Sequence, residues 1–354
     1  MDKILMKKLI ALSILFVVCG LAANALPKKM LSLEVLPLLS SESKQPNRVW
    51  VGTFQLVWND FMDGIIKGPV KFTGYNSILV NELNKQKFKA DQLSENSYYK
   101  TYGEISPELK DEIEKGIKEK FNEISDILGS IDWTPAPDKY LVYAMLKKDF
   151  KFLTAFDKLK PEKFGKNRAK VNYFGINDDS DKVLRNMIHV MFYNSSDDFA
   201  VYIRTQSQDE VYLYRTNDDK TFDRLYSDMF MKKAQFDGKN KFGTKDELKV
   251  PDINLYAVKT FDELTNKIIE NTDGMMISQA METIEFKMNN EGVKLKSEAA
   301  IATTKALLII DNDKPRKFYF DDTFVMFLQE NGKNKPYFAL RVQDADMVNK
   351  TGKN

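Results

Sequence analysis

The sequence predicts an α+β protein whose main part is a single domain. Two observations favour this class: an amphipathic helical pattern lies in the first half of the chain, and strand-like alternation dominates from Tyr140 onward. A third is that no internal repeat, low-complexity tract or Pro/Gly linker divides the middle of the chain. Helices that mostly precede strands are typical of α+β folds built around one core.

Residues 1–25 have the pattern of a signal peptide. Three lysines precede an apolar stretch from Leu9 to Val18, and Ala23-Asn24-Ala25 provides the small residues of a cleavage site. Because the apolar stretch is too short to span a bilayer, a secreted or extracytoplasmic protein is favoured over one held by an anchoring helix. We therefore expect no membrane span after signal removal.

Cleavage after Ala25 would change the composition in two ways. It removes Cys19, the only cysteine, so the mature chain would contain no disulfide and must rely on its core. It also removes three lysines and one aspartate, which leaves 50 basic and 50 acidic residues. Zero net charge gives no electrostatic case for nucleic acid or an anionic membrane as partner. A lipoprotein modified at Cys19 is an alternative that the bulky Val18 disfavours.

The first half of the mature chain is predicted to be mainly helical. Residues 26–48 mix Pro, Ser and Lys and indicate a poorly ordered leader, whereas Trp50 to Ile66 has a helical apolar period. The clearest helix begins at Ser106-Pro107, a capping residue followed by proline at the first helical position. Its buried stripe is expected to consist of Leu109, Ile113, Ile117, Phe121, Ile124 and Leu128.

The second half is predicted to be mainly strands. Alternation marks 140–150, 197–205, 209–216 and 247–258 as strands between charged turns. Two further helices are expected near 220–231 and 261–270.

The residues needed for common catalytic chemistry are missing, so we do not expect an enzyme. His189 is the only histidine and lies among apolar neighbours, where a packed core residue is the favoured interpretation. A hydrolase that uses His189 is kept as a third hypothesis, although no G-x-S-x-G motif accompanies it. No G-x-G-x-x-G motif or P-loop is present, and we expect no small-molecule cofactor. The Asp-rich segments 177–181 and 311–315 lack EF-hand spacing and indicate solvated turns, so no metal site is predicted.

The most informative part of the chain is its C-terminal tail. An alternating strand from Ile277 ends in the turn-like Asn-Asn-Glu-Gly at 289–292, and a run of small residues follows. After a loop comes FYFDDTF at 318–324, and two aromatic-rich strands joined by a polar turn close the tail. Residues 277–292 resemble the serpin pattern V-S-Q-x-x-H-K-x-x-x-x-V-N-E-E-G without a gap, and 318–324 resembles the serpin F-x-A-D-R-P-F.

The serpin resemblance extends upstream at lower specificity. Residues 140–157 are similar to L-V-L-V-N-A-x-Y-F-K-G-x-W-x-x-x-F-D, and the resemblance covers 106–345. It implies a serpin-like domain over 49–345, with mixed and antiparallel β-sheets and a cluster of helices, followed by a flexible tail at 346–354.

The resemblance implies a protease inhibitor with a mobile loop near 297–316. In serpins a protease cleaves this loop, whose N-terminal side inserts into a sheet while the protease stays attached as an acyl-enzyme. The hinge of that loop would be Ser297, Glu298, Ala299, Ala300, Ile301, Ala302, Thr303 and Thr304. The segment that binds the protease would be Lys305, Ala306, Leu307, Leu308, Ile309, Ile310 and Asp311.

The scissile bond and the target protease follow only in part from the sequence. Counting from Gly292 places the bond at Ala306-Leu307, whereas counting from Ser297 places it at Ile310-Asp311. Because the residues after Lys305 are apolar, the expected partner is an extracellular serine or cysteine protease with an apolar primary pocket. An ordinary buried strand is the alternative interpretation of the apolar run.

Several departures from the serpin pattern leave a second function open. The family pattern has an asparagine, a tryptophan and a histidine where this chain has Ala144, Phe152 and Glu282. Residues 293–296 are an insertion that lengthens the hinge and continues an alternating pattern into it. The alternative is therefore a non-inhibitory binding or structural protein in which 293–304 is permanently inserted in the sheet as the second strand of a hairpin.

Overall fold

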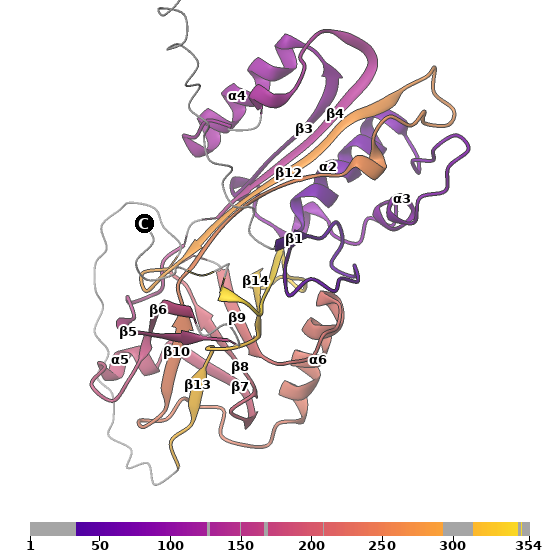
Figure 1. Ribbon diagram of the computed structural model, residues 1–354. Helices are drawn as coiled ribbons and strands as arrows, with labels where there is room; N and C mark the ends of the chain where they lie inside the picture. The colour runs from indigo at the N-terminus through magenta and orange to yellow at the C-terminus, as the bar shows by residue number, and fades with distance from the viewer. Residues whose placement is uncertain are drawn as a thin grey trace, which may run out of the picture. The chain divides into compact units, whose positions relative to one another are not determined.

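The computed structural model describes residues 33–125, 128–148, 150–165, 169–207, 209–292, 314–345 and 348. Within these residues the strands form three β-sheets, and the helices pack on them (Figure 1). Each sheet contains both parallel and antiparallel neighbours. The fold is therefore α+β with mixed sheets, as the sequence predicts.

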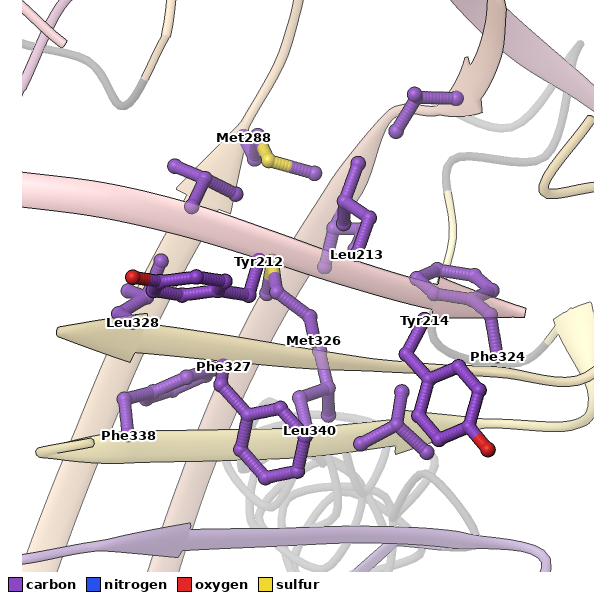
Figure 2. Close-up of a cluster of buried hydrophobic side chains, with 14 of the residues drawn as sticks. Tyr212, Leu213, Tyr214, Met288, Phe324, Met326, Phe327, Leu328, Phe338 and Leu340 are labelled. Atoms are coloured by element: carbon purple, nitrogen blue, oxygen red, sulfur yellow. The ribbon is translucent and has the colours of Figure 1, made fainter. Parts of the chain in front are cut away.

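The largest sheet has seven strands and carries the densest part of the core. In spatial order these are β1 (Leu33–Val35), β2 (Asn47–Val51), β15 (Phe338–Val342), β14 (Phe324–Glu330), β9 (Asp209–Arg215), β8 (Asp198–Arg204) and β7 (Ile188–Ser195). Figure 2 shows apolar side chains of β9, β14 and β15 clustered with Met288. The predicted final strand pair is confirmed, because β14 and β15 pair antiparallel.

A second sheet has four strands. Its spatial order is β13 (Lys317–Tyr319), β10 (Glu247–Pro251), β6 (Ala169–Ile176) and β5 (Asp157–Phe164). The aromatic motif at 318–324 thus starts in β13 and continues through a short bend into β14.

The third sheet carries the candidate site and has helices on both faces (Figure 1). Its spatial order is β11 (Ile253–Thr260), β12 (Met276–Met288), β4 (Ala136–Lys147) and β3 (Tyr98–Ile105). Helix α4 (Pro107–Phe121) packs on Leu141, Tyr143 and Met145 of one face, and α2 (Thr53–Phe61) packs on Val142 and Ala144 of the other. Side chains therefore alternate between two apolar layers along β4.

The order of elements from β12 to β15 matches the order on which the serpin resemblance rests. The strand predicted from Ile277 is β12, and the predicted turn at 289–292 follows it directly. The strands predicted at 140–150, 197–205 and 209–216 correspond to β4, β8 and β9, and 247–258 contains β10 and β11. The described part of the chain thus has its C-terminal strands in the order that the sequence predicts.

Helix α4 begins as predicted and ends earlier. The Ser106 side chain accepts a hydrogen bond from the Leu109 N–H at 3.2 Å and caps the helix, and Asn122 ends it in a left-handed conformation. The predicted stripe runs past this end: Ile124 is exposed, and Leu128 lies in the short turn η4 (Leu128–Ser130).

The other helix predictions had mixed outcomes. The helix expected from Trp50 begins only at Thr53, because Trp50 belongs to β2, and it continues into the π-helical turn η1 (Met62–Ile66). Helix α6 (Phe222–Gln235) confirms the helix expected near 220–231.

The helix expected at 261–270 is wrong. Only the turn η5 (Asp262–Leu264) is helical there, because Asn266 adopts a left-handed φ of 55° that interrupts a helix. The apolar residues Phe261, Leu264 and Ile269 are nevertheless buried, so their helix-like spacing reflects core packing.

The remaining elements are short. They are α3 (Ile78–Leu83), α5 (Lys182–Arg185), η2 (Ala90–Gln92) and η3 (Glu95–Ser97). In the part of the chain that the structure describes, no helix combines the length and apolar character needed to cross a membrane.

The folded domain includes residues that the sequence analysis assigns to a leader. Residues 26–48 were expected to form a poorly ordered leader, but 33–48 are part of the fold. Strand β1 pairs in parallel with β2, and Val35 and Leu36 are buried. The short apolar patch around Leu33 is therefore a strand that covers the edge of the largest sheet. The predicted signal peptide lies outside the described residues.

Candidate functional site at the junction of β4 and β12

The candidate site is the seam between β4 and β12 in the third sheet. Strands β4 and β12 are parallel and pair from Met276 with Lys139 to Glu285 with Lys147. Over Met281 to Glu285 the other edge of β12 pairs with β11, so both edges are occupied there. A strand that entered this sheet beside β12 would have to displace one of these neighbours.

Glu282 is a buried carboxyl group at the centre of this pair. Its side chain points from β12 to the start of α2, where Oε1 accepts hydrogen bonds from Thr53 Oγ1 at 2.8 Å and from the Phe54 N–H at 3.0 Å. Gly52, the residue before the helix, offers no side-chain cap, so Glu282 takes that role from a distant strand. The carboxyl group thereby ties β12 to α2.

Burial controls the protonation of Glu282. Because the side chain is only 1% exposed, desolvation raises the pKa of Glu282 to about 8, and the two hydrogen bonds from α2 oppose this rise. The second oxygen, Oε2, is buried without a hydrogen-bond partner. The group is therefore mostly neutral at pH 7, as expected of a carboxyl held in an apolar layer.

The three departures from the serpin pattern lie near this seam. Ala144 is directly opposite Glu282 in the pairing of β4 with β12, so the neighbouring strand offers the carboxyl group no side-chain partner. Phe152 is buried in a cluster of aromatic rings, with centroids 4.9 Å from Phe156 and 5.9 Å from Phe174. The aromatic packing that the family pattern implies at this position is kept, whereas the polar contact at Ala144 is lost.

The chain reverses direction immediately after β12. The Asn289 N–H donates to the Gly292 carbonyl at 2.9 Å and the Gly292 N–H to the Asn289 carbonyl at 3.1 Å, which confirms the predicted turn. Asn289 Oδ1 accepts from the Glu291 N–H and stabilises the bend. Gly292 has a φ of +119°, and a Cβ placed there would lie 2.4 Å from the Phe150 carbonyl oxygen. Only glycine fits this position without movement of the backbone.

The segment that follows β4 clamps this turn. The Phe152 N–H donates to the Glu291 carbonyl at 3.1 Å, and the Phe156 N–H donates to the Asn290 carbonyl at 2.9 Å. The turn therefore lies at the end of the seam between β4 and β12.

A buried ionic cluster fixes the end of β4. Lys148 Nζ lies 2.9 Å from Asp209 Oδ1 and 2.8 Å from Glu330 Oε1, and all three side chains are at most 10% exposed. The Tyr337 hydroxyl donates to Asp209 at 2.8 Å, and the Ser94 N–H donates to Glu330 at 2.9 Å. The cluster joins the β4 sheet to β9 and β14 of the largest sheet.

The predicted hinge and protease-binding residues cannot be compared with this geometry. Hinge residues 297–304 and loop residues 305–311, like the inserted residues 293–296, lie outside the described part of the chain. The structure describes the residues on either side, which are Gly292 in the turn and Lys314 just before β13.

His189 lies apart from this site. Its ring stacks on Tyr202 of β8 with centroids 4.5 Å apart, and burial together with the Arg204 charge lowers the pKa of His189. Within the described ranges, no group of three or more His, Cys, Asp or Glu side chains is arranged to hold a metal ion.

The sequence analysis identifies Glu282 as a departure from the serpin pattern. It does not predict the hydrogen bond from Thr53 to Glu282 or the buried ionic cluster around Lys148. A signal for the first was present: Glu282 stands between Ala280 and Ile284 on the inward face of an alternating strand, where a charged residue needs a partner. Lys148 gave no such signal, because its carboxylate partners are 61 and 182 residues away in the chain.

Comparison with known proteins gives structural matches only. No family model matches the chain, and no curated protein matches it. Among solved structures it is similar to thyroxine-binding globulin in complex with thyroxine, with a TM-score of 0.45, 12% identity, and 66% of this chain and 63% of that chain covered. It is also similar to human thyroxine-binding globulin complexed with thyroxine (TM-score 0.47, 10% identity, 88% and 78% covered). A further match is Serpin48, described as a highly specific serpin of the insect Tenebrio molitor (TM-score 0.46, 13% identity, 86% and 93% covered).

Proposed function

We propose that this serpin-like chain is an exported inhibitor of an extracellular serine or cysteine protease. The segment 305–311 would be the bait that the protease cleaves, and 293–304 would then enter the sheet between β4 and β12. The observation that carries the proposal is the parallel pairing of β4 with β12, followed by a chain reversal at the end of their seam.

Strand direction supports this path. Because β4 and β12 run the same way and the chain reverses at 289–292, a segment that returned between them would be antiparallel to both. One parallel ladder would be replaced by two antiparallel ladders, which are slightly more stable per residue. The twelve residues 293–304 would extend about 40 Å, close to the length of the thirteen-residue β12.

The side-chain pattern of the segment supports the same path. Val293, Leu295 and Ile301 alternate with polar or small residues, so one face would enter an apolar layer beneath the sheet. Burial of these three side chains would contribute about 4–9 kcal/mol in total. The new backbone hydrogen bonds would roughly offset the entropy lost when the segment becomes ordered.

Separation of β4 from β12 would be resisted by contacts that the structure describes. The hydrogen bonds of Glu282 hold β12 on α2, and the clamp between the 289–292 turn and the segment after β4 closes the end of the seam. An inhibitor of this type needs such a barrier, because its active state must persist although the inserted state is more stable.

The alternative is a non-inhibitory protein with 293–304 permanently inserted. The inhibitor is supported instead by the pairing of β12 with β4 on one edge and with β11 on the other. A permanently inserted hairpin strand would need one of these two edges of β12. The four inserted residues 293–296 favour the alternative, because they continue the strand pattern.

The test is to incubate residues 26–354 with elastase-like and chymotrypsin-like proteases and to look for a complex that survives SDS. We expect such a complex with proteases whose primary pocket is apolar. Thr303→Arg should convert the inhibitor into a substrate, because a long charged side chain would enter the apolar layer. The matched variant Glu298→Arg, on the opposite strand face where the chain already has a charged side chain, should retain more of the complex. Clean cleavage of the unmodified chain by every protease of the panel, without a complex, would exclude inhibition.

A further inference from the structure

We propose that this chain forms a dimer by antiparallel pairing of β3 with β3 of a second copy. Strand β3 (Tyr98–Ile105) is an outer strand of the third sheet, and among the residues that the structure describes it pairs only with β4. The seam between β4 and β12 lies on the other side of β4, so dimerisation through β3 would not require the proposed inhibitory function.

The outer edge of β3 is open to solvent. Helices α2 and α4 cover the two faces of the sheet, and beneath them residues 141–146 of β4 are buried. Residues 99–104 of β3 contact the same two helices, yet each of these residues is at least partly exposed. Because Gly103 has no side chain, its exposed surface belongs to the backbone. Solvent therefore reaches the backbone of β3 from the side that β4 does not occupy.

Strand β3 has few of the features that keep an outer strand from pairing. Outer strands are commonly protected by shortness, proline, bulges or several charged residues. Strand β3 has eight residues and no proline, and its pairing with β4 is regular from Tyr98 to Glu104. Its sequence YYKTYGEI is rich in residue types that favour strands. The N–H and C=O groups along its outer edge can therefore pair with another strand.

The sequence of β3 favours one register with a second copy. Two identical strands that pair antiparallel are related by a two-fold axis, so each contact occurs twice. An axis centred on Tyr102 places Lys100 of each copy directly opposite Glu104 of the other. The same register pairs residues 99–105 of both strands and places the two Tyr102 side chains next to each other. No other register sets Lys100 opposite Glu104.

Lys100 and Glu104 can make these contacts beside their present partners. Lys100 Nζ lies 2.5 Å from Asp60 Oδ2, and an ammonium group has three donors. The Tyr140 hydroxyl donates to Glu104 Oε1 at 3.3 Å, and a carboxylate has a second oxygen. The other charged side chains recorded near the tyrosines of β3 and Tyr140 are Glu95, Glu112, Lys120 and Asp138. Because carboxylates outnumber ammonium groups here, the two ion pairs select the register and backbone hydrogen bonds supply the association.

This register predicts how two charge-reversed variants behave when they are mixed. In Lys100→Glu alone and in Glu104→Lys alone, like charges would lie opposite each other twice, so self-association should weaken at least about tenfold. In a dimer that contains one copy of each variant, both positions again hold opposite charges. An equimolar mixture should therefore dimerise about as strongly as the unmodified chain. Sedimentation equilibrium of residues 26–354 measures the dissociation constant in each case.

The matched control is the pair Lys89→Glu and Asp91→Lys, two exposed positions in and next to the turn η2. These substitutions change net charge by the same amounts and should leave self-association unchanged, alone and mixed. The same loss and recovery in the control pair would show that net charge is responsible, and pairing through β3 would be wrong. A monomeric unmodified chain at submillimolar concentration, or equal dimerisation of all variants, would also overturn it.

Amide hydrogen exchange of the unmodified chain tests the same surface without a substitution. Dimerisation through β3 should slow the exchange of N–H groups within residues 98–105 as the protein concentration rises. Exchange in β11, the other outer strand of this sheet, should not depend on concentration. A dimer that protects β11 alone, or neither of these two strands, would contradict pairing through β3.

Discussion

Replacement of Glu282 by glutamine should remove a pH dependence of stability that this one residue creates. Burial raises the pKa of Glu282 to about 8 in the folded state, whereas in the unfolded chain it returns to about 4.5. Between these two values the folded state holds a proton that the unfolded state has lost. The stability contributed by this residue is therefore fully present below pH 4.5 and is lost as the pH rises through 8.

The size of this change in the free energy of unfolding follows from the distance between the two pKa values of Glu282. Each pH unit inside the range reduces the free energy of unfolding by about 1.4 kcal/mol, which amounts to about 4 kcal/mol between pH 5 and pH 8. Glutamine keeps the carbonyl oxygen that accepts from Thr53 and Phe54. Its amide group replaces the unpartnered Oε2 and leaves buried N–H donors without acceptors, at a pH-independent cost of about 1–3 kcal/mol.

The assay is urea unfolding of residues 26–354 at pH 5, 6, 7 and 8. The variant should be less stable than the unmodified chain at pH 5 and equal or more stable at pH 8, so that the two stability curves cross. Glu285→Gln, on the same strand but paired with Lys287 near the surface, should not change the slope. Parallel curves for Glu282→Gln and the unmodified chain would refute the reasoning.

The other predictions concern the buried ionic cluster and the turn after β12. Lys148→Met should destabilise the protein by about 3–5 kcal/mol in urea unfolding, because it leaves Asp209 and Glu330 buried without their cation. The control Lys147→Met breaks a half-exposed ion pair with Glu123 and should lower the free energy of unfolding by less than about 1 kcal/mol. Equal losses of stability in the Lys147→Met and Lys148→Met variants would contradict the role of the buried ionic cluster. Gly292→Ala should lower the melting temperature far more than Gly332→Ala, since both have positive φ but only Gly292 has backbone atoms within 3 Å of the new Cβ. Equal shifts would show that the clamp on the turn is loose.

Local patterns predicted those elements whose structure is set by nearby residues. The cap at Ser106, the alternation along β12 and the turn at 289–292 depend on residues a few positions apart, and each was found at its predicted place. The strand at Leu33 was missed because it is stabilised by β2, which begins more than ten residues later.

Long-range packing explains what the sequence did not predict. Phe261, Leu264 and Ile269 have helical spacing because they fill one core under the third sheet, while the backbone between them turns at Asn266. The role of Glu282 as the cap of α2 depends on Thr53, which is 229 residues away. The alternating pattern of one strand predicts that such a carboxyl group is buried. It does not predict which helix donates hydrogen bonds to that group.

The most direct test of the central claim is the melting temperature of the protein before and after a single cleavage within 305–311. If 293–304 enters the sheet between β4 and β12, the cleaved protein gains a central strand and should melt about 10 °C or more above the intact one. An unchanged or lower melting temperature after clean cleavage would contradict the claim that this sheet accepts the segment.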